Sequence, residues 1–135
     1  MLDYLKDDLE TVKKELQRIH FFLTEPETEE IRLQTLEYFD TVFKDTLVLL
    51  SRFLKEEYSV REKEASGIIS RGFELKLYNA PTYSRLKELA ADMERKKKDV
   101  DAVFARIRDD YVFLLRLLLD MLSRFGDEAD EEEGA

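Results

Sequence analysis

The chain has 135 residues, of which 44% are hydrophobic and 39% are charged. This size and balance predict one globular domain rather than a disordered chain. The sequence contains no cysteine, which excludes a disulfide framework and a thiol nucleophile and favours a reducing compartment. We therefore expect a cytoplasmic protein.

Acidic residues outnumber basic residues by 31 to 22, which gives a net charge of −9. Six of the acidic residues lie between Asp127 and Glu133, in a stretch without an apolar side chain larger than alanine. These features predict a folded domain over residues 1–125 and a disordered acidic tail over residues 126–135. Such a tail disfavours nonspecific binding to nucleic acid, although it does not exclude a local basic site.

The sequence does not have the features of a membrane protein. Acidic residues closely follow Met1, so the N-terminus does not have the pattern of a signal peptide. The most apolar segment is interrupted by Arg116 and Asp120 and is far shorter than the ~20 residues needed to cross a bilayer. We expect no contact with a membrane.

The first predicted helix carries apolar residues at alternating spacings of three and four. This heptad pattern is typical of a short coiled coil or of one helix in a bundle. Other amphipathic segments follow it, so we interpret it as a bundle helix. The residues of this seam are Leu2, Leu5, Leu9, Val12, Leu16, Ile19 and Leu23.

A second helix is predicted from about Glu27 to Glu57, because Pro26 and its acidic neighbours suit a first helical turn. Two adjacent apolar stripes run along it, which indicates a central helix with several neighbours. One stripe consists of Leu36, Phe39, Phe43, Leu47, Leu50 and Leu54, and the other of Tyr38, Val42, Leu49 and Phe53.

A third, short helix is predicted to begin at Ser59, because Ser59-Val60-Arg61-Glu62 has the form of a capping box. We expect it to end at Arg71-Gly72, with the glycine as its stop. The following segment, Phe73–Tyr83, is predicted to be irregular, because Asn79-Ala80-Pro81 interrupts any continuous helix there.

A fourth helix is predicted from Thr82 or Ser84 to a run of four cations, Arg95-Lys96-Lys97-Lys98, which we call the basic cluster. A fifth helix follows the basic cluster. Asp99 or Asp101 can cap its N-terminus.

The fifth helix is predicted to reach Phe125 and is apolar almost all round between Tyr111 and Leu122. Such a helix is either buried on every side or shared with a subunit interface. We therefore predict an all-α fold, an antiparallel bundle of about five helices, and a homodimer formed through this helix or the second one.

Three segments carry a resemblance to a known family: Tyr38-Phe39-Asp40 with Leu50-Ser51-Arg52-Phe53-Leu54, then Ser59-Val60-Arg61-Glu62, then Phe104-Ala105-Arg106-Ile107-Arg108-Asp109-Asp110-Tyr111. In their order and spacing they resemble the HEPN superfamily, in particular the nucleotidyltransferase substrate-binding proteins. The resemblance covers roughly residues 2–122. It implies a dimeric five-helix module paired with a separate minimal nucleotidyltransferase, in the manner of a toxin–antitoxin pair. The partner would supply the metal-binding carboxylates and the nucleotide site, and the helical subunit would shape the acceptor pocket.

The chain departs from the family at its motif, Arg-Asn-x-x-x-His. Arg95 matches the arginine, but Lys96 replaces the asparagine and Val100 replaces the histidine. Valine cannot transfer a proton, and Ala102 stands where some relatives carry a tyrosine that is nucleotidylated. The resemblance therefore implies a non-catalytic binding subunit without a cofactor. The alternatives are a diverged HEPN ribonuclease that uses unmatched residues and a purely structural helical homodimer.

Six residues are candidates for binding a substrate or nucleotide: Arg95, Lys96, Lys97, Lys98, Tyr78 and Tyr83. Clustered cations beside a helix start favour a phosphate or an RNA backbone, although a solvated charge run at a helix end is the alternative. The two tyrosines fall in the irregular segment, where they can line a pocket.

No catalytic residue and no metal site are predicted. His20 is the single histidine and lies beside the heptad seam, far in sequence from any carboxylate pair. Asp99-Val100-Asp101 imitates a magnesium-binding Asp-x-Asp motif, but it lacks the preceding turn and strand, and helix capping explains it better.

Overall fold

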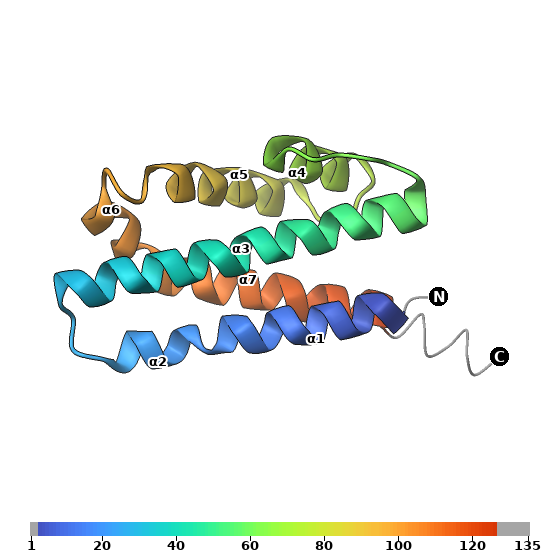
Figure 1. Ribbon diagram of the computed structural model, residues 1–135. Coiled ribbons are helices and arrows are strands. Elements are labelled where there is room, and N and C mark those ends of the chain that lie inside the picture. The colour runs from blue at the N-terminus through green and yellow to red at the C-terminus, as the bar shows by residue number, and fades with distance from the viewer. Residues whose placement is uncertain (1–2, 127–135) are drawn as a thin grey trace.

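The computed structural model describes residues 3–126, which form an antiparallel helical bundle without strands (Figure 1). The predicted all-α class is confirmed. Helices α1–α2 and α5 run in one direction, and α3 and α7 run in the other. The elements are α1 (Asp3–Gln17), α2 (Ile19–Thr24), α3 (Glu29–Tyr58), α4 (Ala65–Glu74), α5 (Ala80–Arg95), α6 (Val100–Ala105), α7 (Ile107–Met121) and the π-helical turn η1 (Leu122–Gly126).

Over the described residues, no helix combines the length and the apolar character needed to cross a bilayer. The predicted acidic tail lies outside the described residues, apart from Gly126, which ends η1.

The heptad seam of the first helix faces the core, as its period predicts. The helix is interrupted once, at Arg18, where the backbone remains helical (φ −65°, ψ −21°) and the amide donates to the carbonyls of Lys14 and Glu15. The helices α1 and α2 therefore lie nearly end to end (Figure 1). The buried seam residues are Leu5, Leu9, Val12, Leu16 and Ile19.

The central position predicted for the second helix is confirmed, since α3 contacts α1, α2, α4 and α6. It begins two residues later than predicted, because Thr28 is its N-cap: the Thr28 hydroxyl accepts the Ile31 amide at 3.1 Å. Nearly all of the two apolar stripes is buried, while Tyr38 is half-buried and donates from its hydroxyl to the Glu15 carbonyl at 2.8 Å.

The prediction that Ser59 opens the third helix is wrong. Ser59 has a left-handed backbone (φ 58°) and ends α3. Its amide donates to the Lys55 carbonyl, which is the 5→1 bond of the αL C-cap motif, and the Val60 amide donates to the Leu54 carbonyl, both at 3.1 Å. The last carbonyls of the long helix use this segment as their cap, so α4 begins only at Ala65.

The prediction that Gly72 stops the third helix is also wrong, because α4 continues to Glu74. Gly72 is needed instead for close packing: the ring and hydroxyl of Tyr78 lie where a Cβ on residue 72 would stand. The chain turns at Lys76, whose backbone is left-handed (φ 61°).

Helix α5 begins at Ala80, earlier than predicted. The side chain of Asn79 caps it by accepting the Thr82 amide at 3.0 Å, and Pro81 occupies the first turn, where its missing N–H costs nothing. The Asn79-Ala80-Pro81 sequence therefore starts α5, after α4 has already ended at Glu74.

The fifth predicted helix is divided into α6 and α7 at Arg106 (φ −97°, ψ −4°). Asp99 occupies the N-cap position of α6 but forms no capping hydrogen bond, and Asp101 binds Arg32 instead (Oδ1 to Nη1, 2.7 Å). Capping by either aspartate is therefore not what positions this helix. On α7, Val112 and Leu119 are 41% and 45% exposed, so the single bundle leaves part of this apolar helix uncovered.

Candidate functional site

The six predicted site residues lie at opposite ends of α5. The basic cluster ends and follows the helix, whereas Tyr78 precedes its N-terminus and Tyr83 lies in its first turns. A helix of 16 residues is about 24 Å long. The basic cluster and the tyrosines therefore belong to two separate sites.

At the C-terminal end, Arg95 is anchored to the buried carboxylate of Asp92, which is 5% exposed. Arg95 Nε lies 3.1 Å from Oδ1, and Arg106 binds the same carboxylate through Nε to Oδ2 at 3.0 Å and Nη2 to Oδ1 at 2.7 Å. Burial alone would raise the pKa of Asp92, but the hydrogen bonds from Arg106 and Arg95 outweigh it and hold this pKa below its ordinary value. Arg95 thus pairs within α5, and Arg106 joins the same carboxylate to the α6–α7 junction.

Lys96 is anchored in the same way, to Asp40 of α3. Its Nζ lies 2.8 Å from Asp40 Oδ2, and Lys44 Nζ approaches the same oxygen at 3.1 Å. Asp40 is 5% exposed, and its Oδ1 has no hydrogen-bond partner among residues 3–126. The lysine that stands in place of the family's asparagine therefore supplies the counter-charge of a buried aspartate.

A third buried aspartate, Asp110 on α7, is less well compensated. Arg85 Nη2 lies 3.4 Å from its Oδ1, and its Oδ2 has no partner in the described part of the chain. Burial raises the pKa of Asp110, the negative charge of Asp92 adds to the increase, and Arg85 offsets only part of it.

Only two cations of the basic cluster remain available to a ligand. Lys97 and Lys98 are exposed, and within residues 3–126 their side chains have no hydrogen-bond or ion-pair partner. They border a recess of about 480 Å³ between α3 and α5, which Phe43 and Met93 help to line. Val100, at the last motif position, is half-buried against the core at the start of α6.

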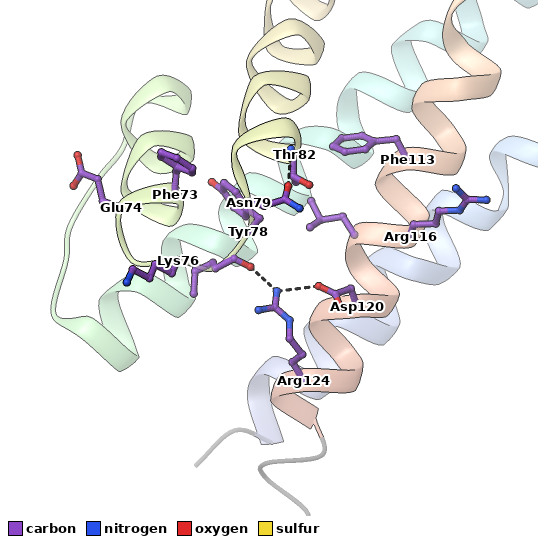
Figure 2. A pocket seen from close by; sticks show the side chains of 12 residues that line it. Phe73, Glu74, Lys76, Tyr78, Asn79, Thr82, Phe113, Arg116, Asp120 and Arg124 are labelled. Carbon is purple, nitrogen blue, oxygen red and sulfur yellow. Dashed lines mark hydrogen bonds and ion pairs between the residues drawn. The ribbon is translucent and has the colours of Figure 1, made fainter.

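At the N-terminal end of α5, a recess of about 910 Å³ lies between the α4–α5 turn and α7 (Figure 2). Its apolar walls come from Phe73 on α4, Leu77 in the turn, and Phe113 and Leu117 on α7. This volume falls within the range of about 300–1,000 Å³ that is typical of small-molecule sites.

The two tyrosines have different places beside this recess. Tyr78 lines it, but it is largely buried and its hydroxyl donates to the Ile69 carbonyl; burial also raises its pKa far above the physiological range. Tyr83 does not line this recess. Its ring stacks on Phe73 (centroids 4.5 Å apart, planes at 9°) and supports that wall.

Polar groups stand on both sides of the recess (Figure 2). The Oδ1 of Asn79 is occupied by the Thr82 amide, whereas the Asn79 amide nitrogen and the Thr82 hydroxyl have no protein partner among residues 3–126. On the α7 side, Asp120 Oδ2 pairs with Arg124 Nη2 at 2.9 Å, and Arg124 also donates to the Leu77 carbonyl. Lys76, held in its left-handed conformation, lies at the edge.

Sequence reasoning missed the α7 side of this recess and all three buried aspartates. A signal for the first was present, because Arg116, Asp120 and Arg124 follow one another at intervals of four in an otherwise apolar helix. Asp40 lies four residues after Leu36 and three before Phe43, on the same helix face as an apolar stripe, which is the corresponding signal for its burial.

The remaining candidates do not form a site. His20 is exposed, and its ring is edge-on to Phe21 with centroids 6.4 Å apart. Within residues 3–126 no group of three or more histidine, aspartate or glutamate side chains is arranged to hold a metal ion.

The sequence matches no protein-family model and no curated protein. The fold is similar to the crystal structure of a protein from Thermus thermophilus, with a TM-score of 0.67 and 19% sequence identity over 87% of this chain and 98% of that chain. At this level of identity, the likeness shows a shared helical fold and nothing about activity.

Proposed function

We propose that the chain is a non-catalytic subunit that binds an acceptor substrate for a separate minimal nucleotidyltransferase. The observation that carries this proposal is the recess at the N-terminal end of α5, where apolar walls meet the Asn79 amide nitrogen and the Thr82 hydroxyl, both without a partner in the described part of the chain. Such a site suits a small molecule with an apolar body and a hydroxyl group. The partner would transfer a nucleotidyl group from a nucleoside triphosphate to that hydroxyl and release pyrophosphate.

The basic cluster is the weaker choice for the acceptor, because half of it already neutralises buried charge. Arg95 and Lys96 are bound to Asp92 and Asp40. RNA or a nucleotide at this end of α5 would rely on Lys97 and Lys98 alone, without an exposed aromatic ring in the adjacent recess to stack on a base.

The assignment as non-catalytic is supported by the state of the ionisable groups near both sites. The lowered pKa of Asp92 makes it a poor proton acceptor near neutral pH, and the hydroxyl of Tyr78 is already donated to a backbone carbonyl. Position 100 is a valine, and His20 lies on α2, outside the recess. The two carboxylates that line the recess, Glu74 and Asp120, are paired with Arg71 and Arg124. The proposal therefore assigns the catalytic base to the partner.

Co-expression with each minimal nucleotidyltransferase of the same genome tests the proposal. We expect one of them to co-purify and to modify an acceptor only in the presence of this chain. Phe113→Ala should lower kcat/KM of the complex for the acceptor about tenfold without dissociating it. Phe21→Ala is the matched control, since Phe21 is 69% exposed and lies outside the recess. Cleavage of RNA by the purified chain alone would instead support the ribonuclease alternative and overturn the proposal.

We also propose that the subunit is a homodimer through α7. Val112, Leu115 and Leu119 lie at i, i+3 and i+7 on one face; the first and last are exposed and Leu115 is half-buried. Light scattering should give twice the chain mass of 16.0 kDa for the native protein and the chain mass for Leu119→Lys. A native protein that is monomeric at micromolar concentration would contradict this interface.

A further inference from the structure

Two adjoining recesses form one groove along α3. The recess of about 480 Å³ beside the basic cluster continues into another of about 680 Å³ beside the α3–α4 connection, and Lys44, Leu47 and Ala65 line both. On α3 the groove extends from Asp40 to Glu56, which corresponds to about 24 Å of helix. It shares no lining residue with the recess at the N-terminal end of α5.

The groove has an apolar centre. Buried side chains, among them Leu47, Ile68 and Met93, form its floor. Val48, which also lines it, lies in the middle of α3 and is 67% exposed. A partner that covers Val48 would gain apolar burial.

The charge of the groove is opposite to that of the chain. Seven of its lining side chains are basic and four are acidic, whereas the chain as a whole carries −9. Asp40 is already paired with Lys96 and Lys44, Glu62 with Arg71 (Oε1 to Nε, 3.3 Å), and Arg52 with Asp8 of α1 (Nη1 to Oδ2, 2.8 Å). The cations left uncompensated by the described residues are Lys55, Lys63, Lys97 and Lys98. The groove is therefore a local positive region on an acidic protein.

Free cations stand at both ends of the groove. Lys97 and Lys98 lie at one end and Lys55 lies at the other, while Lys63 lies between them on the α3–α4 connection; within residues 3–126 none of these four side chains has a hydrogen-bond or ion-pair partner. The wall between the two ends is fixed in place, since Ser51 Oγ donates to the Glu62 carbonyl at 2.9 Å and holds the α3–α4 connection against α3. A ligand would therefore meet a preformed surface.

We infer that this groove is the docking site for an acidic amphipathic helix of a partner protein. A helix of about 16 residues fits the length of the groove, with one apolar face on Leu47 and Val48 and carboxylates reaching the lysines at both ends. A single-stranded nucleic acid fits less well, because Phe43 is only 2% exposed and offers no stacking surface.

Fluorescence anisotropy with a labelled synthetic peptide of about 16 residues tests the inference. The peptide carries leucines at helical i, i+3 and i+4 spacing and glutamates on its flanks, and a scrambled peptide of the same composition is the control. We expect binding in the micromolar range that weakens as salt is raised, and at least tenfold weaker binding of the scrambled peptide.

The variants separate the groove from the overall charge. Lys55→Glu with Lys97→Glu should weaken peptide binding at least tenfold, and Val48→Asp should do so without removing a lysine. Lys14→Glu with Lys87→Glu makes the same change in net charge outside the groove and should bind like the native chain. Circular dichroism of each variant establishes that it is folded.

Absence of peptide binding, equal binding of the scrambled peptide, or an equal loss in the Lys14→Glu, Lys87→Glu control would each overturn the inference. Tighter binding of a single-stranded RNA than of the peptide would also overturn it. Because the acceptor recess is lined by other residues, loss of acceptor modification in Phe113→Ala tests the proposed function separately from peptide docking.

Discussion

The two ends of α5 use their polar groups in opposite ways. At the C-terminal end, Arg95 and Lys96 are bound to the buried aspartates Asp92 and Asp40. At the N-terminal end, Asn79 and Thr82 use one hydrogen bond to cap the helix and leave further polar atoms facing a recess. The difference teaches that a dense run of cations in a sequence indicates a binding site only after the buried acids beside it have been counted.

The largest effect on stability should come from removing the carboxylate of Asp92, which Arg95 and Arg106 share. Asp92→Asn should lower the free energy of unfolding by about 2 kcal/mol, because Arg95 and Arg106 lose their shared counter-charge while keeping some contact with water. Urea denaturation measures it. Asp101→Asn breaks an exposed pair with Arg32 and should cost no more than about 0.5 kcal/mol. Equal losses in the two variants would show that the buried Asp92 network contributes no more to stability than an exposed ion pair.

A steric change tests the packing at the N-terminal end. Gly72→Ala should cost about 1–2 kcal/mol, because its methyl group would overlap the ring and hydroxyl of Tyr78. In Gly67→Ala the new methyl group meets only the flexible end of Glu62, and alanine is the better helix former, so its stability should be unchanged or slightly higher. Thermal denaturation of both variants decides the matter, and an equally mild Gly72→Ala would mean that Tyr78 is free to move.

Stability measurements can separate the lysine of the basic cluster that pairs with a buried aspartate from the two lysines that do not. Lys96→Ala should lower the free energy of unfolding by about 1 kcal/mol, because Asp40 then keeps only the more distant Lys44. Lys97→Ala and Lys98→Ala should each change it by less than about 0.5 kcal/mol, since neither side chain has a partner among residues 3–126. A uniform response in urea denaturation would imply that all the lysines are simply solvated.

The smallest expected effect concerns Asp110 and has a defined pH dependence. Asp110→Asn should raise stability by about 0.5 kcal/mol at pH 7, because it removes a buried charge that Arg85 compensates only in part. The folded pKa of Asp110 lies above its unfolded value of 3.8, so the native chain regains this stability as pH falls from the raised pKa towards 3.8. The advantage of the variant should therefore vanish in acid.

Asp92 should respond to pH with the opposite sign. Its folded pKa is lowered, so its stabilising contribution is complete above the ordinary value of 3.8 and is lost as pH falls through the lowered value. Urea denaturation of Asp92→Asn and Asp110→Asn between pH 7 and pH 3 would display the two trends together. Parallel trends would contradict the different environments that the structure gives these carboxyl groups.

The parts of the fold that the sequence predicts are those fixed by periodicity. The seam of α1 and the two stripes of α3 repeat over many turns, so an error at one residue does not change the pattern. Ser59 was misinterpreted because a short capping motif is equally compatible with the end of one helix and the start of the next, and the demand of α3 for a cap decided between them. The break between α6 and α7 at Arg106 was not predictable in this way, because no proline or glycine lies beside it in the sequence.

The sites were less predictable because their parts are distant in sequence. The basic cluster and Tyr78 are visible as local features, but the anchor of Lys96 and the far wall of the recess beside Tyr78 are on other helices, at Asp40 and Phe113. No local pattern pairs Lys96 with a residue 56 positions earlier. Local sequence features therefore identified both ends of α5 as candidate sites, but they did not show at which end polar atoms remain available to a ligand.

The arrangement around Asp92 has a consequence for how this sequence can drift. One carboxylate serves two guanidinium groups, so replacing Asp92 leaves two cations crowded together, whereas replacing either arginine leaves the other bond intact. Substitutions here should accordingly appear in a fixed order among descendants of the chain, with Arg95 or Arg106 exchanged first and the aspartate last.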